Sequence, residues 1–291
     1  MLKSFKKILV PFSTKSRLKT SAIFTVLVVS LLSVQFGFAQ DTVTNNAFQV
    51  GEHLNYRLNY SSSFGEFNAG IVDIDVGMAK EKNLADGHTV YHVVISGKSN
   101  GFFDVIYKVR DHFETYFDSA TLLPYRFVRQ THEGHYVFND QVDFNRKKGT
   151  AINSRKEISI PANVHDIISV VYFMRTLNIK DFCQDSTYYF YFYLDDSVYY
   201  SMVKFIGHET LETKWGWIPC LKIKPMMATG EIFAEKYPLT MWVTDDKNHI
   251  PLRAESKIIV GSVRMKLSGY SGLKTPMIKS FNGRNKKRAI K

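Results

Sequence analysis

Alternation of apolar and polar residues recurs along this chain and constrains its fold more than any other feature. In residues 54–60, "LNYRLNY", every second side chain is apolar and the intervening ones are Asn or Arg. Residues 105–117 and 257–267 repeat the pattern. Successive side chains of a strand point to opposite faces, so this period of two predicts half-buried strands. With turn-like stretches such as "LADGHT" and "NRKKGT" between them, they predict a mainly β fold, a curved antiparallel sheet or a barrel or roll.

One segment after residue 40 has the spacing of a helix, from about 163 to 178. Asn163 suits the N-cap, and Asp166 lies near the start, where a carboxylate favours the helix dipole. Further apolar residues lie off the main stripe, so the helix is expected to be buried against the sheet. The main stripe consists of Ile167, Val170, Val171, Met174 and Leu177.

Six aromatic residues follow one another at 188–193, "YYFYFY". On a strand, Phe190 and Phe192 share one face, which we expect to pack inward. The other face carries tyrosine rings, whose hydroxyls need water or a hydrogen-bond partner. We predict that this tyrosine face is an accessible surface that binds a ligand, and the alternative is ordinary cross-strand pairing on the exterior. The candidate ligand-binding residues are therefore Tyr189, Tyr191 and Tyr193.

The two ends of the chain differ from its body. Residues 1–39 hold six basic and no acidic residues, an apolar run at 22–34 and small residues before Gln40. This order predicts a cleaved signal peptide, with an uncleaved anchor as the alternative. Residues 274–291 hold seven basic and no acidic residues and are expected to form a flexible tail. Residues 40–273 are then a single β-rich domain.

The formal charge of +11 comes from these ends, because the rest of the chain carries 25 basic and 27 acidic residues. A nearly neutral body does not indicate a nucleic-acid-binding protein. We expect membrane contact only through the signal peptide or the basic tail. Nothing in the sequence specifies the oligomeric state.

The two cysteines, Cys183 and Cys220, lie 37 positions apart without a CxxC motif. In an oxidising compartment they form a disulfide if their strands are neighbours; otherwise each is a buried thiol. Their spacing predicts neither a redox site nor a zinc site.

No catalytic motif emerges from the sequence. GxSxG, HExxH, Walker A and GxGxxG patterns are absent. His112 and Glu114 share a strand face that also carries Lys and Arg, and a solvated surface explains them. Asp245, Asp246 and Asn248 suit a tight turn better than a calcium site. We therefore predict no catalytic residue, no metal and no cofactor.

Four stretches resemble the exported bacterial family called domain of unknown function 3108. The similarity combines an aspartate-initiated helix that ends in arginine with a late hairpin, "WVTDDKNHIP". It implies export, a mostly β fold in one domain and a bacterial envelope setting, and it implies no activity or catalytic residue. The basic tail and the aromatic run depart from the family pattern. The resembling stretches are residues 48–60, 102–134, 164–175 and 241–267.

Three classes of function follow. The first is a periplasmic or envelope binding or carrier module for a lipid, a glycan or a peptide, favoured by the aromatic content of 14%. The second is an envelope structural or assembly factor that acts through a protein partner. The third is a hydrolase with an unrecognised site.

Overall fold

The computed structural model describes most of the chain after residue 41. The predicted signal peptide, its cleavage point at Gln40, Cys183 and the end of the basic tail lie outside the described residues. The described ranges are 42–63, 65–80, 84, 87–178, 184–226, 238–257 and 261–280.

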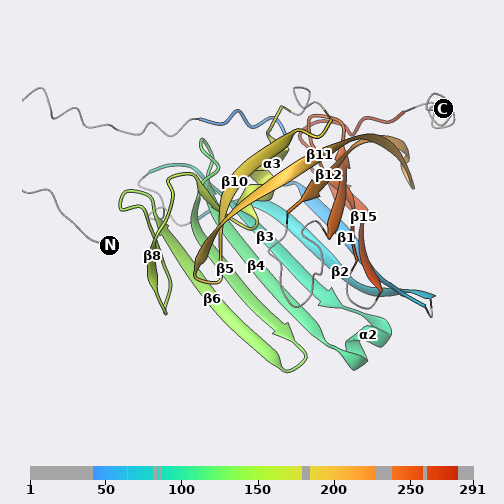
Figure 1. The fold of residues 1–291 in the computed structure, drawn as a ribbon, viewed down its shortest axis with the longest axis horizontal. Coiled ribbons are helices and arrows are strands. Elements are labelled where there is room, and N and C mark those ends of the chain that lie inside the picture. The colour runs from blue at the N-terminus through green and yellow to red at the C-terminus, as the bar shows by residue number, and fades with distance from the viewer. Residues whose placement is uncertain are drawn as a thin grey trace, which may run out of the picture. The chain divides into compact units, whose positions relative to one another are not determined.

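One continuous sheet of 15 strands dominates these residues (Figure 1). Its order is β8-β7-β6-β5-β4-β3-β2-β1-β15-β14-β13-β12-β11-β10-β9. The strands are β1 (His53–Ser62), β2 (Gly65–Met78), β3 (Val90–Ser99), β4 (Val109–Asp118), β5 (Pro124–Glu133), β6 (Tyr136–Asn145), β7 (Thr150–Ile152), β8 (Glu157–Ser159), β9 (Val164–Asp166), β10 (Thr187–Leu194), β11 (Ser197–Thr213), β12 (Gly216–Pro225), β13 (Leu239–Thr244), β14 (Pro251–Lys257) and β15 (Ser262–Ser271).

The strand order is two meanders joined along β1 and β15. Neighbouring strands are antiparallel except β9 and β10, which pair in parallel through Val164–Asp166 and Tyr191–Tyr193. The predicted mainly β fold and curved antiparallel sheet are confirmed. The sheet is open, because β8 and β9 stand at its two ends and are not paired with each other.

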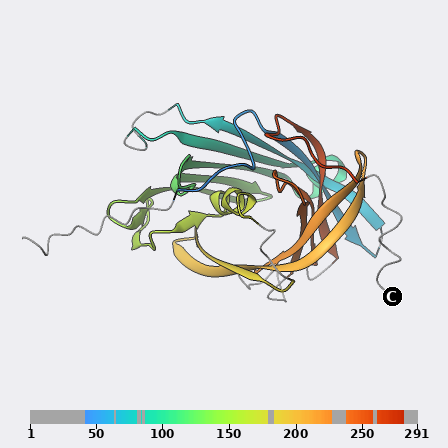
Figure 2. The same cartoon turned by 90° about the horizontal axis from the view of Figure 1, so that it is seen from above.

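The sheet curls so that helix α3 (Ser169–Arg175) lies inside its curve (Figure 2). Phe48, Phe117 and Tyr172 belong to one core cluster, on the β2–β8 side. A second cluster lies on β1, β11–β15 and the C-terminal segment. A third combines α3 residues such as Val170 with apolar side chains of β10–β13. The helix therefore contributes to two clusters from its two sides.

The predicted helix at 163–178 is buried, as expected, but shorter. Val164–Asp166 forms strand β9 and not the first turn of the helix, because its backbone pairs with β10. Asn163 does not cap the helix; the Asp166 carboxylate accepts hydrogen bonds from the N–H groups of Ile168 and Ser169, at 2.7 and 2.8 Å. Within the described ranges, no helix has the length and apolar character needed to cross a bilayer.

A second short helix, α2 (Gly101–Ile106), was not predicted. The strand expected from residue 105 begins instead at Val109. Phe103 packs its ring against Tyr60, and Asp104 pairs with Arg110, which holds these residues in a helical turn ahead of β4.

The first part of the predicted flexible tail is bound to the body. The Asn248 side chain exchanges hydrogen bonds with the backbone and hydroxyl of Thr275 at 2.9–3.2 Å. Met277 is buried, and the N–H of Ser280 donates to the carbonyl of Trp217 at 2.7 Å. The tail prediction is corrected accordingly for residues 274–280.

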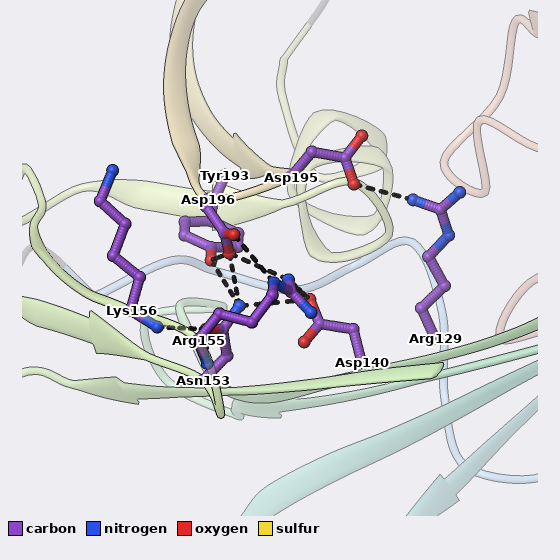
Figure 3. Close-up of polar contacts among 8 residues, drawn as sticks. All are labelled: Arg129, Asp140, Asn153, Arg155, Lys156, Tyr193, Asp195 and Asp196. Carbon is purple, nitrogen blue, oxygen red and sulfur yellow. Dashed lines mark hydrogen bonds and ion pairs between the residues drawn. The ribbon is translucent and has the colours of Figure 1, made fainter. Parts of the chain in front are cut away.

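Polar side chains fasten the two ends of the sheet to each other (Figure 3). Arg155, which follows β7, bonds Asp196 in the β10–β11 turn and Asp140 on β6. Asp195 and Asp196 have φ values of 48° and 59°, so this tight turn presents both carboxylates together. We call this group the clasp: Arg129, Asp140, Asn153, Arg155, Asp195 and Asp196.

Candidate ligand-binding cavity

A cavity of about 480 Å³ lies between α3 and the β10–β14 part of the sheet. This volume is within the range of small-molecule sites, roughly 300–1,000 Å³. Most of its lining side chains are aliphatic or aromatic. They include Ile167, Val170, Val171, Met174, Leu177, Tyr188, Phe190, Phe192, Leu194, Val203, Phe205, Ile223, Met226, Leu239, Met241 and Val243.

Strand periodicity explains why these side chains gather. Every second residue of β10 lines the cavity, from Tyr188 through Phe190 and Phe192 to Leu194. Neighbouring β11 contributes alternate residues in the same way. Because one face of each strand points into the curve of the sheet, an apolar face on several adjacent strands becomes an apolar wall.

Helix α3 forms the opposite wall. Val170, Val171 and Met174 line the cavity, whereas Ile168 and Tyr172 pack into the β2–β8 core cluster. The helix is apolar nearly all round because it has a core on one side and the cavity on the other. This accounts for the apolar residues that lay off the predicted stripe.

A buried ion pair fixes the C-terminal end of α3. The Arg175 guanidinium donates to the two carboxylate oxygens of Glu52 at 2.6 and 2.7 Å, and to the backbone oxygens of Asn248 and Ala47. Both charged side chains are buried, at 4% and 0% exposure. Arg175 borders the cavity, but its charge is already compensated by Glu52.

Besides Arg175 and Tyr188, the described lining holds one more ionisable residue, His249. Its Nδ1 donates to the carbonyl oxygen of Arg175 at 2.7 Å, because a carbonyl can only accept. Burial lowers the pKa of His249, and the hydrogen bond to Arg175 only partly opposes this. The imidazole is therefore neutral at pH 7, and Nε2 is a hydrogen-bond acceptor.

The N-terminal end of α3 is fixed by Asp166. Besides the two backbone N–H groups of the helix start, its carboxylate accepts a hydrogen bond from Thr115 on β4 at 2.5 Å. Burial raises the pKa of Asp166, while these hydrogen bonds act in the opposite direction. Asp166 and Arg175 thus tie both ends of the cavity wall to the sheet.

The late hairpin between β13 and β14 completes this framework. Asp246 accepts hydrogen bonds from the hydroxyl of Thr244 and the N–H groups of Asn248 and Ile278, as expected for a turn residue. Asn248 presents its carbonyl to Arg175. Among the described residues, no cluster of three or more His, Cys, Asp or Glu side chains is placed to hold a metal ion.

The predicted tyrosines do not line the cavity. Tyr189 is 50% exposed and stacks on Tyr200 with ring centroids 5.4 Å apart, and Tyr191 packs partly against the β2–β8 core cluster. Tyr193 is only 2% exposed, so it is not on an accessible surface; its hydroxyl donates to Asp196 at 3.0 Å. A ligand-binding role for the three tyrosines stays a prediction. Phe190 and Phe192 pack inward, as expected, in the third core cluster, and they also border the cavity.

Cys220 is a free thiol buried on β12, and its Sγ donates to the carbonyl of Ile218 at 3.3 Å. Cys183, its predicted partner, lies outside the described residues.

Comparison with known proteins addresses the family and the fold. The model of the family described as "Protein of unknown function (DUF3108)" matches residues 55–268. The chain belongs to this family. The match includes α3, with Asp166 and Arg175, and the β13–β14 hairpin, whereas Glu52, the partner of Arg175, and Thr275, the partner of Asn248, lie outside the matched residues. No curated protein matches the chain.

Two solved structures are similar to this DUF3108 protein. A β-barrel-like protein of the domain of unknown function DUF1849 from Brucella abortus has 11% identity and a TM-score of 0.51, over 78% of this chain and 99% of that chain. A protein described as having a YmcC-like fold, from Bacteroides fragilis, has 12% identity and a TM-score of 0.33, over 79% and 99% of the two chains. The first likeness concerns the fold alone, and the second score is too low to add to it.

Proposed function

We propose that the protein is a non-enzymatic carrier of the bacterial envelope that holds the apolar chain of a lipid in the cavity under α3. The observation that carries this proposal is the lining: around about 480 Å³ of space, most side chains of α3 and β10–β14 are apolar. The proposal of export rests on residues 1–39, in which basic residues are followed by an apolar run and then by small residues, as in a signal peptide.

The polar groups of the lining favour a lipid chain over a glycan. Arg175 is already paired with Glu52, and the Ser201 hydroxyl donates to the backbone oxygen of Met226 at 2.9 Å. A glycan would bury many hydroxyls that this lining leaves without partners, and unpaired buried hydroxyls are costly. A hydrocarbon chain needs none, so a charged head group would stay outside the apolar part of the site.

The chain length of the ligand gives a quantitative test. Each methylene moved from water into the cavity contributes roughly 0.8 kcal/mol, which is about a fourfold gain in affinity. Displacement of the apolar dye N-phenylnaphthylamine by a series of fatty alcohols should show this gain per methylene. The gain should end abruptly at the length that fills the cavity.

A pair of adjacent variants separates the cavity from the rest of the surface. Ile223 lines the cavity, and Lys224 faces the other side of β12 because successive side chains alternate. Ile223→Trp should fill part of the cavity and shorten the longest alcohol accepted, whereas Lys224→Trp should leave it unchanged. Equal chain-length limits in the two variants would refute the proposed site.

A further inference from the structure

The short helix α2 directs its apolar stripe toward solvent. Phe102, Val105 and Ile106 have the spacing i, i+3 and i+4, so they share one face. They are 71%, 86% and 63% exposed. In a surface helix of a globular protein this stripe normally faces the core, so α2 is turned the opposite way.

The inward face of α2 is held in place by specific contacts. The Phe103 ring lies 5.8 Å from that of Tyr60, between centroids. Asp104 accepts hydrogen bonds from Ser99 at 2.6 Å and from both terminal nitrogens of Arg110 at 2.6 and 3.0 Å. These bonds, chiefly the one from Arg110, lower the pKa of Asp104 to about 2. The helix therefore binds the body through Phe103 and Asp104 and exposes Phe102, Val105 and Ile106.

The exposed apolar surface continues onto the β5–β6 hairpin. The N–H of Gly134 donates to the carbonyl of Lys108 at 2.8 Å, and a Cβ on Gly134 would lie 2.9 Å from the Tyr107 ring, so the hairpin tip rests on the segment after α2. Tyr136 and Val137 follow that tip and are exposed. We call the combined surface the tip patch: Phe102, Val105, Ile106, Tyr107, Tyr136 and Val137.

Basic side chains flank the tip patch. Lys98 precedes α2 on β3 and Lys108 follows it, and both are exposed. The acidic residue of the segment from Lys98 to Arg110 is Asp104, which Arg110 neutralises. The segment thus carries two further positive charges next to an exposed apolar stripe.

We infer that the tip patch docks on an anionic lipid bilayer, with the α2 stripe in the boundary between head groups and acyl chains. Interfacial helices combine an apolar face with Lys and Arg beside it, and those cations attract anionic head groups. The patch lies at the strand ends where α2 connects β3 to β4 (Figure 1), and a flat membrane surface can reach it there. This docking goes beyond the proposed cavity, whose lining does not include α2.

Vesicle binding of the protein starting at Gln40 tests the inference. The probes are phosphatidylcholine vesicles with and without about 30% phosphatidylglycerol, at low and high salt. Wild type should sediment with the anionic vesicles and be released by salt. The triple variant Phe102→Ser/Val105→Ser/Ile106→Ser should bind them at least roughly tenfold more weakly, because burial of those side chains is lost. The matched control is Tyr189→Ser/Tyr200→Ser, which removes exposed aromatic rings elsewhere and should bind as wild type does.

A site-specific signal completes the experiment. Tryptophan emission of Val105→Trp should shift to shorter wavelength on anionic vesicles, and that of Tyr200→Trp should not.

Equal vesicle binding by wild type and the triple variant, or no binding by wild type, would overturn the inference. So would a lipid-free wild-type dimer that the triple variant converts to monomers, since a second copy of the chain would then cover the patch. N-phenylnaphthylamine binding without vesicles reports the cavity separately, so loss of docking and failure of the carrier proposal are distinguishable.

Discussion

Arg175 and Glu52 are 123 positions apart in the sequence, and their side chains meet in a buried, two-bond ion pair. Arg175 ends α3, and Glu52 immediately precedes β1. The pair therefore ties the cavity wall to the strand at which the two meanders join.

Removing one partner of this pair is expected to destabilise the protein strongly. Glu52→Gln leaves a buried guanidinium without a counter-charge, which should lower the free energy of unfolding by about 3–5 kcal/mol in urea titrations. Glu255→Gln, which loses the partly exposed pair with Arg264, should cost less than about 1 kcal/mol. The double variant Glu52→Leu/Arg175→Met should recover much of the loss. Similar effects of the two single variants would contradict the assigned role.

Stability is expected to depend on pH through His165. Burial, together with nearby Arg146, lowers the pKa of His165 to about 3, whereas the unfolded chain has a pKa near 6.5. The unfolded state thus binds more protons between these values, so this contribution to stability is complete above pH 6.5 and is lost as the pH falls. The slope should approach about 1.4 kcal/mol per pH unit.

Urea titrations of His165→Phe between pH 6.5 and 4.5 measure that slope. The variant should show a smaller slope than wild type. Phe173→Leu is the control, because it replaces a ring whose centroid lies 4.8 Å from that of His165 but removes no titratable group. It should lower the free energy of unfolding by the same amount at each pH. Parallel pH curves for wild type and His165→Phe would show that His165 is not the group responsible.

The thiol of Cys220 is expected to be unreactive in the folded protein. Burial raises the pKa of Cys220 to about 12, so almost no thiolate is present at pH 8. Iodoacetamide should leave the peptide containing Cys220 unmodified in native buffer and alkylate it fully in urea. Rapid alkylation of the native protein would mean that β12 opens at this residue.

The two faces of β10 are expected to give different binding results. Phe192→Ser places a hydroxyl in the cavity wall and should weaken fatty-alcohol binding, whereas Tyr191→Ser should leave it unchanged. Both variants lose aromatic contacts, so urea titrations are needed to show that each is folded. Weakened binding in Tyr191→Ser alone would support the tyrosine site predicted from the sequence.

The strands were predictable because the alternation of apolar and polar residues follows directly from a strand with one buried and one exposed face. The helix was predictable in place but not in extent: Asn163 and Asp166 suit a helix start, yet Val164–Asp166 pairs with β10 in the folded chain. Helix α2 was missed because Val105 and Tyr107 extend the alternation of β4 by chance. Its helical turn depends on side-chain contacts with residues elsewhere in the sheet.

The cavity could not be predicted for a different physical reason. Alternation separates Phe192 from Tyr193 but does not tell which face lies inside the curve of the sheet. That depends on the curl, which places Tyr193 in the β2–β8 core cluster and brings Asn153 of the clasp to its hydroxyl, while Asp196 of the β10–β11 turn accepts from that hydroxyl. Tyr193 is therefore buried with its hydroxyl satisfied, while Phe190 and Phe192 pack in the third core cluster and also border the cavity.

The clasp has a mechanical consequence for the cavity. In a closed barrel, strand number and stagger fix the radius, because a continuous ladder of backbone hydrogen bonds runs round the circumference. Here that ladder ends at β8 and β9, and ion pairs join the two sides instead, from Arg129 on β5 to Asp195 and from Arg155 after β7 to Asp196. Side-chain pairs of this kind lengthen or exchange partners far more readily than a strand ladder. The circumference of the sheet is therefore held on this side by the clasp, whose ion pairs can be removed without the loss of any strand pairing.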